Sequence, residues 1–198
     1  MPSINTEQTI SRPAFLGSGK FDTKGVTLAA GFGAIIPGTV LGKITSSGKY
    51  APVARTTFRM NEAIGQTILG VTDASVIQIG DTVKLIQKAL NTATDSFAVT
   101  SRDLTAGANT ITVAYTITVA YTTGDLVRVV DGSETAKGIL IAHEDSGASS
   151  TDDDYGDKDI SIVIAGNVLS ANCTGLDSQG RIDLNTAQGG GIYFSDKL

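Results

Sequence analysis

The sequence has very few of the residues that most catalytic sites use. Among 198 residues there are one cysteine (Cys173), one histidine (His143) and no tryptophan. A single cysteine excludes an intrachain disulfide, and these two side chains are too few to form a zinc site. A Cys173–His143 catalytic pair is conceivable, but a small apolar cysteine in or near a core is the favoured interpretation.

No other catalytic motif compensates for this shortage. The G-x-S-x-G turn that carries a nucleophilic serine is absent. Paired carboxylates of the glycosidase kind are not excluded by the sequence, but most acidic residues lie in turns with Gly, Ser and Thr, where Asp has an ordinary structural role. We therefore expect no enzyme, no catalytic residues, no bound metal and no cofactor.

Charged residues are also sparse, at 18%, and the formal net charge is −5 with a pI near 4.7. An acidic chain with scattered basic residues argues against nucleic-acid binding, which requires clustered Lys and Arg. No apolar run approaches the length of a transmembrane helix, and the N-terminus lacks the basic-then-apolar order of a secretion signal. We expect a soluble protein that is made in a cytoplasm and contacts no membrane.

What the chain does contain is typical of a mainly β fold. It has 23 glycines and many Thr, Ser, Val and Ile residues, and only 6% of its residues are aromatic. This composition favours short strands joined by turns over long helices. One or two helical turns are possible within residues 176–187, although Gly180 weakens that prediction. The length fits one domain or two small ones.

Two local patterns suggest a ligand but favour a structural interpretation. G-F-G at residues 31–33 lacks the third glycine, the Lys-Ser/Thr pair and the helix of a phosphate-binding loop. The acidic run D-D-D-Y-G-D-K-D at residues 152–159 invites a calcium hypothesis, yet it does not place ligands at the EF-hand positions. A solvated acidic hairpin loop is favoured there, and cation binding by it is left open.

The middle of the chain predicts a β-rich unit of its own. The phrases I-G-D-T-V-K-L-I (residues 79–86) and T-G-D-L-V-R-V-V (residues 123–130) are each a Gly-Asp turn followed by an alternating strand. Between them T-I-T-V-A-Y occurs twice in succession, at residues 110–115 and 116–121. Period-2 alternation puts Ile111, Val113 and Tyr115 on one face and continues in phase. We expect a small antiparallel barrel or sandwich of about six strands, with a short helix as an alternative for residues 85–94.

Three stretches in order carry a resemblance to a known family. They are V-L-G-K-I-T-S-S-G-K-Y-A-P-V-A (residues 40–54), D-G-S-E-T-A-K-G-I-L-I-A-H-E-D (residues 131–145) and I-V-I-A-G-N-V (residues 162–168). Together they resemble the lambda-type head decoration proteins of tailed bacteriophages, over about half of the chain. The departure from the family pattern is an insertion of some seventy residues between the first two stretches.

The resemblance implies a compact β-tulip-like decoration core, formed by residues 21–55 plus 129–198 and interrupted by an inserted β subdomain at residues 56–128. It also implies a homotrimer that binds the major capsid protein at three-fold sites of the expanded head and stabilises the head against internal DNA pressure. The protein would then lie on the exterior of the virion after synthesis in the host cytoplasm. A different class, a β-rich module that binds a host surface or glycan, is the alternative.

Residues 1–20 have no sustained periodicity, and we interpret them as a flexible arm that binds the capsid. Their apolar residues are too few for self-burial and are plausible anchors on a partner: Ile4, Ile10, Phe15 and Leu16. Such an arm can bind by strand addition, where backbone hydrogen bonds supply much of the contact. An ordinary frayed terminus is the competing interpretation.

Overall fold

The computed structural model describes residues 13–17, 20–90, 92–105, 107–148, 150–186 and 191–195, and confirms the expected mainly β fold with one short α-helix. The elements in chain order are β1 (Asp22–Leu28), β2 (Ala34–Ile35), β3 (Val40–Lys43), β4 (Tyr50–Pro52), β5 (Arg55–Thr57), β6 (Ile68–Gly70), β7 (Thr82–Gln87), β8 (Thr92–Asp103), β9 (Thr110–Val113), β10 (Leu126–Val129), β11 (Ala136–Leu140), β12 (Glu144–Asp145), β13 (Lys158–Leu169), the 3₁₀ turn η1 (Ser170–Asn172), α1 (Ser178–Asn185) and β14 (Ile192–Ser195).

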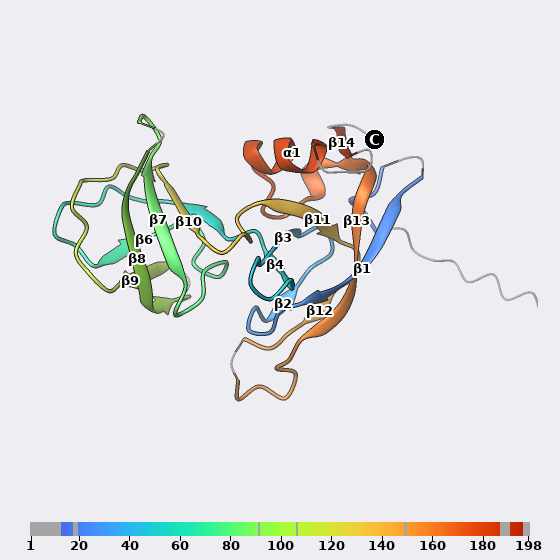
Figure 1. The fold of residues 1–198 in the computed structure, drawn as a ribbon, viewed down its shortest axis with the longest axis horizontal. Coiled ribbons are helices and arrows are strands. Elements are labelled where there is room, and N and C mark those ends of the chain that lie inside the picture. The colour runs from blue at the N-terminus through green and yellow to red at the C-terminus, as the bar shows by residue number, and fades with distance from the viewer. Residues whose placement is uncertain are drawn as a thin grey trace, which may run out of the picture.

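The first sheet is a small five-stranded barrel. Its strand order is β1-β4-β3-β11-β13, and pairing of β1 with β13 closes the ring. β14 extends the sheet by pairing in parallel with the last part of β13. The short helix α1 lies near β11 and β14, at one end of this barrel (Figure 1).

The barrel brings together two stretches that are about eighty residues apart in the chain. β3 pairs with β11 in antiparallel register, with Val40 opposite Ile139 and Gly42 opposite Ala136. β3 also pairs with β4, so residues 40–52 form the hairpin that the sequence predicts. Val40 and Ile139 are fully buried and pack in one apolar cluster with Leu184 of α1, whereas their neighbours Leu41 and Leu140 are buried in a second cluster on the other face of the sheet.

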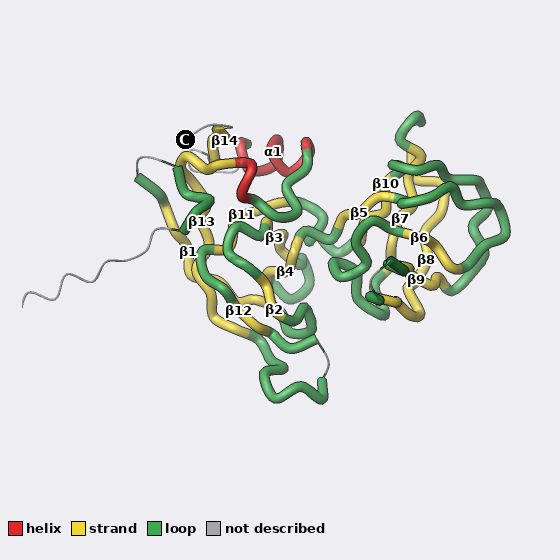
Figure 2. Tube along the Cα trace, turned by 180° about the vertical axis from the view of Figure 1, so that it is seen from behind, coloured by secondary structure: helices red, strands yellow, loops and turns green. Residues whose placement is uncertain are grey.

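The second sheet is formed entirely by β5 to β10 and curls into an antiparallel half-barrel of order β5-β10-β7-β8-β9-β6. Its two outer strands approach each other where a bridge joins Phe58 to Val71 and the Arg59 amide donates to the Gly70 carbonyl. Figure 2 shows this sheet beside the barrel, joined to it by the chain entering β5 and leaving β10. Separate apolar clusters fill the two units, with Ala54 the first residue of the half-barrel cluster.

The two Gly-Asp phrases form equivalent turns in the half-barrel. In the first, the carboxylate of Asp81 accepts from the Gln78 amide, and in the second Asp125 accepts from the Thr122 amide. β7 and β10, which follow these turns, are antiparallel neighbours. The sequence similarity therefore corresponds to one local structure used twice.

The repeated hexapeptide does not form the continuous strand predicted from its periodicity, and that prediction was wrong. β9 ends at Val113, and the next residues turn away from the sheet. Tyr115 is 72% exposed, whereas Tyr121, its counterpart in the second copy, is 1% exposed and stacks on Phe58. The second copy is instead held in the half-barrel by the buried Asp95 carboxylate, which accepts from the amide and hydroxyl of Thr118 and from the hydroxyl of Tyr121.

The structure also tests the two helices that the sequence suggested. The helix offered as an alternative for residues 85–94 does not form, since β7 runs to Gln87 and β8 begins at Thr92. The helical turns expected within residues 176–187 do form as α1, with the Asp177 carboxylate capping its N-terminus by accepting from the Gly180 amide.

Candidate functional site

The first described residues are bound to the barrel along β13. The Leu169 amide donates to the Phe15 carbonyl at 2.7 Å, and the Gly17 amide donates to the Asn167 carbonyl at 2.9 Å. Leu16 forms a bridge with Val168, so residues 15–17 act as a short extra strand. On the other side of the same part of β13 lies β14. We call this surface, formed by residues 15–17, 166–169 and 192–195, the terminal face.

Of the four residues predicted to contact a capsid, the structure describes two. Ile4 and Ile10 lie outside the described residues. Phe15 is 2% exposed and packs in the barrel's own apolar cluster, and Leu16 is half-buried against the same cluster. Phe15 is thus a core residue of its own chain, and the capsid-binding role of all four residues stays a prediction.

The terminal face offers a sheet edge. Within the described residues β14 is the last strand of its sheet, so one edge of its backbone has no neighbouring strand. Tyr193 on this strand is 61% exposed, and the guanidinium of Arg181 lies 5.5 Å from the ring centroid of Phe194. An open edge beside the entry of the N-terminal segment is an arrangement in which strand addition can occur. In Figure 1 this part of the barrel lies away from the half-barrel.

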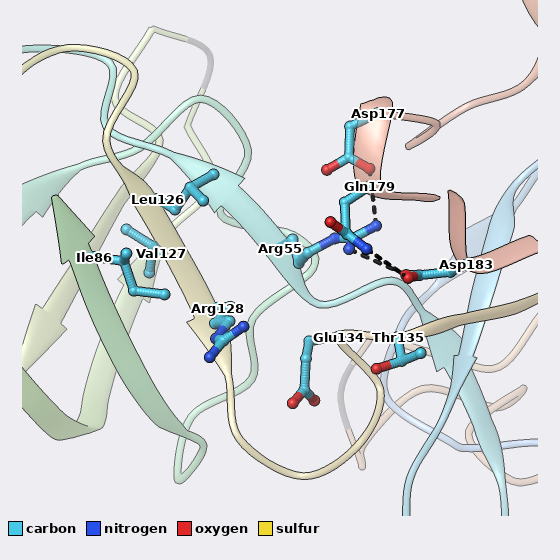
Figure 3. Close-up of a pocket in the computed structure, with 10 residues that line it drawn as sticks. All are labelled: Arg55, Ile86, Leu126, Val127, Arg128, Glu134, Thr135, Asp177, Gln179 and Asp183. Atoms are coloured by element: carbon cyan, nitrogen blue, oxygen red, sulfur yellow. Dashed lines mark hydrogen bonds and ion pairs between the residues drawn. The ribbon is translucent and has the colours of Figure 1, made fainter. Parts of the chain in front are cut away.

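A second candidate is the junction between the barrel and the half-barrel, which is organised around Arg55. This residue begins β5, and its guanidinium donates to Asp177 at 2.8 Å and to Asp183 at 3.3 Å (Figure 3). The Arg55 side chain is only 10% exposed, and its Nε has no hydrogen-bond partner within the described residues. Asp183 also accepts from the Ala136 amide, so one carboxylate ties the helix to both β5 and β11.

Gly180 explains how Arg55 comes so close to the helix. A Cβ atom at this position would lie 3.2 Å from Nη2 of Arg55 and 3.1 Å from Oδ1 of Asp177. Glycine lowers helix stability by about 1 kcal/mol relative to alanine, but here its missing side chain makes room for the ion pairs. The residue that weakened the helix prediction is therefore the one that permits the junction. An Asp three residues before a Gly was the available signal for the cap, but no local signal pointed to Arg55.

A cavity of about 370 Å³ adjoins these ion pairs. Arg128, Glu134 and Gln179 line it together with Arg55, Asp177 and Asp183 (Figure 3). Its charged groups are of both signs, and no group of three or more metal-ligating side chains is found among the described residues. The arrangement is suited to holding the half-barrel in place, and nothing in it selects a ligand.

Replacing Arg55 by methionine is expected to lower the free energy of unfolding by about 1–3 kcal/mol, because Asp183 loses a charged donor in a site that is 12% exposed. Arg128 provides the matched control. It lies directly opposite Arg55 on β10, is exposed, and forms no ion pair within the described part of the chain. Arg128→Met should change stability by less than about 0.5 kcal/mol. Urea unfolding followed by circular dichroism measures both, and equal effects would contradict the role of Arg55.

The lone cysteine is placed as a packing residue. Cys173 is half-buried against the barrel cluster, and its thiol donates to the Leu169 carbonyl at 3.5 Å. Burial raises the pKa of the Cys173 thiol to about 11, and the nearby charge of Arg181 only partly opposes this shift. A thiol with such a pKa is almost fully protonated at neutral pH and is a poor nucleophile. His143 is exposed, and no contact with Cys173 is observed.

Two carboxylates of the acidic loop accept hydrogen bonds from backbone amides. Asp157 pairs with Lys49 at 2.5 Å and accepts from the Ala30 amide at 3.2 Å. Asp152 accepts from the Ala148 amide at 2.8 Å. The hydrogen bond from Lys49 is the main cause that lowers the pKa of Asp157. These contacts fit a hairpin loop and add no support to the calcium hypothesis.

The G-F-G stretch has no backbone donors left for a phosphate. The amides of Gly31 and Gly33 donate to the carbonyls of Ser146 and Gly147, and the Phe32 amide donates to the Ser146 hydroxyl. A phosphate-binding loop requires these amides to point at the ligand. Here they fasten the loop between β1 and β2 to the segment that follows β12.

Among the residues that the structure describes, no helix is long and apolar enough to cross a membrane. Comparisons of the chain with protein-family models, with curated proteins and with solved structures found no match.

Proposed function

We propose that this protein is a structural capsid decoration protein of a tailed bacteriophage. It binds as a homotrimer to the major capsid protein at three-fold sites of the expanded head and stabilises the head against internal DNA pressure. The five-stranded barrel is the tulip-like decoration core of this proposal, and the half-barrel is its inserted subdomain. The function requires neither catalysis nor a cofactor.

The observation that carries the proposal is the pairing of β3 with β11. These strands belong to the two separate stretches that resemble the decoration family, residues 40–54 and 131–145. The third stretch, residues 162–168, lies in β13, the other neighbour of β11. The three stretches thus form one continuous part of the barrel, as expected if they derive from a single ancestral module that tolerated an insertion at a surface turn.

The terminal face supports a capsid-contact role for this side of the barrel. It combines the entry of the N-terminal segment with β14, the last strand of its sheet among the described residues, and strand addition uses such an edge. With three arms in a trimer, weak individual contacts add up to tight binding. The half-barrel then projects away from the shell, because it lies on the other side of the barrel (Figure 1).

The test is sedimentation of purified protein with expanded, empty phage capsids, with unexpanded procapsids as the control. We expect the protein to sediment with expanded capsids only and to saturate at three copies per three-fold site. Absence from the capsid pellet would contradict the proposal. Binding to host-cell envelopes or polysaccharide in place of capsids would instead favour the host-surface module.

A further inference from the structure

The half-barrel has an exposed surface with almost no charge. The sequence has no charged residue between Asp103 and Asp125, and within residues 60–72 the only charged residue is Glu62, which is 4% exposed. The Glu62 carboxylate accepts from the Gly70 amide at 2.6 Å and is directed into the structure. In a chain of net charge −5, this region is therefore a neutral part of an acidic molecule.

The same region carries large exposed apolar side chains. Met60 is 47% exposed, Ile64 65%, Ile68 60% and Tyr115 72%. We call these four residues the neutral patch. Such side chains on a surface without charge are typical of the centre of a protein interface, where charged residues are depleted and Met and aromatic residues are enriched.

The four residues belong to neighbouring segments. Cγ of Met60 lies 3.1 Å from the Cβ position of Gly70, which is two residues from Ile68 on β6. Ile68 pairs with Thr112 on β9, three residues before Tyr115. The amide of Gly65, next to Ile64, donates to the carbonyl of Ile117, two residues after Tyr115. The patch thus follows the β6–β9 side of the half-barrel and the loops that continue from it.

We propose that the neutral patch binds the neutral patch of a second copy of this chain. Two copies of an acidic protein repel each other over most of their surfaces, and the patch is a region where they can meet without opposing like charges. Three of its four side chains are aliphatic, which suits a protein surface better than a sugar, for which several aromatic rings would be expected. Arg59 lies at the border of the patch, where its guanidinium is held in place by donating to the carbonyls of Gly107 and Ala108.

A patch that binds itself forms a two-fold contact. Such a contact differs in symmetry from a trimer's three-fold axis, so it joins trimers to one another. This part of the inference rests on the proposed decoration function. On a head, two-fold contacts between projecting half-barrels would link neighbouring trimers above the shell.

Sedimentation equilibrium over a wide range of protein concentration tests the inference. We expect the average mass of the wild-type protein to rise at least about twofold with concentration, as two-fold contacts form. The double variant Ile64→Lys/Tyr115→Lys should keep the mass of the smallest species throughout. The matched control is Ile79→Lys/Leu90→Lys, which changes two residues of similar exposure outside the patch by the same charge and should associate like the wild type.

Circular dichroism of each variant checks that it is folded. A wild-type mass that does not change with concentration, or a patch variant that associates as strongly as the wild type, would overturn the inference. The same measurement distinguishes a failure of this inference from a failure of the proposed function. The smallest species is a trimer if the decoration proposal holds and a monomer if it fails, and in the second case the patch gives a dimer.

Discussion

Replacing Gly42 by alanine is expected to destabilise the barrel by about 3 kcal/mol, a large part of the stability of a small domain. Gly42 lies in β3 and is buried. A Cβ atom there would lie 1.9 Å from the carbonyl oxygen of Ser133 and 2.6 Å from its carbonyl carbon. Both are backbone atoms, so no side-chain rotation can relieve the clash.

The clash is costly because Ser133 cannot move independently. Ser133 lies in the turn between β10 and β11. Its amide and hydroxyl both donate to the Asp131 carboxylate. Moving Ser133 away from β3 would also shift β11, which begins at Ala136 and pairs with β3. The substitution therefore acts on the contact between β3 and the segment that leads into β11.

Gly25 in β1 of the same barrel is the matched control. It is exposed, and a Cβ atom there would have no neighbour within 4 Å. Gly25→Ala should be neutral or stabilise slightly, because alanine restricts the unfolded chain. Urea unfolding followed by circular dichroism gives both values. A Gly42→Ala protein as stable as Gly25→Ala would show that β3 and the Ser133 backbone are not held as closely as described.

Deleting residues 1–12 is expected to leave the protein folded and to weaken its binding to expanded capsids by at least about 100-fold. The fold is retained because the deletion spares Phe15 and the backbone hydrogen bonds between residues 15–17 and β13. Binding is lost because the proposed anchors Ile4 and Ile10 are removed from every copy of the proposed trimer at once. Co-sedimentation with capsids at graded protein concentrations measures the change.

The position of Phe15 determines where this deletion must stop. A deletion of residues 1–20 would also remove a core side chain, and loss of a buried phenylalanine side chain costs about 3–5 kcal/mol. Ile4→Ser/Ile10→Ser in the full-length chain should reproduce most of the loss, whereas the control Asn5→Ala/Gln8→Ala should bind normally. Normal capsid binding by the shortened protein would show that the N-terminal segment is not the capsid-binding arm.

Much of the fold could be predicted from local patterns. The hairpin at residues 40–52 could be predicted because alternating apolar residues flank a turn sequence. This pattern depends only on residues that are close in the chain. The same is true of the two Gly-Asp turns, where the carboxylate accepts from an amide three residues earlier. The helix was foreseen only weakly, because the feature that stabilises its start, the Asp177 cap, competes with the cost of Gly180.

The candidate sites depended on contacts that no local pattern contains. Periodicity predicts the same environment for Tyr115 and Tyr121. Tyr115 is nevertheless exposed, whereas Tyr121 stacks on Phe58 and donates to Asp95 in the core. No sequence pattern around Arg55 distinguishes it from the other basic residues. It becomes the centre of an ion-pair cluster only because α1 packs beside it. Its partners lie more than 120 residues away.

The sequence by itself determined that this protein is mainly β, since this follows from alternation and turn residues. That residues 40–54 and 131–145 belong to one module was predicted from the resemblance to the decoration family, and the structure shows that the strands in these two stretches pair. Only the tertiary structure decided that Phe15 belongs to the core, that Arg55 holds the junction, and that a neutral apolar patch is left exposed on the half-barrel. The reason is physical: alternation specifies which side of a strand a residue occupies, whereas burial depends on which distant segment covers that side.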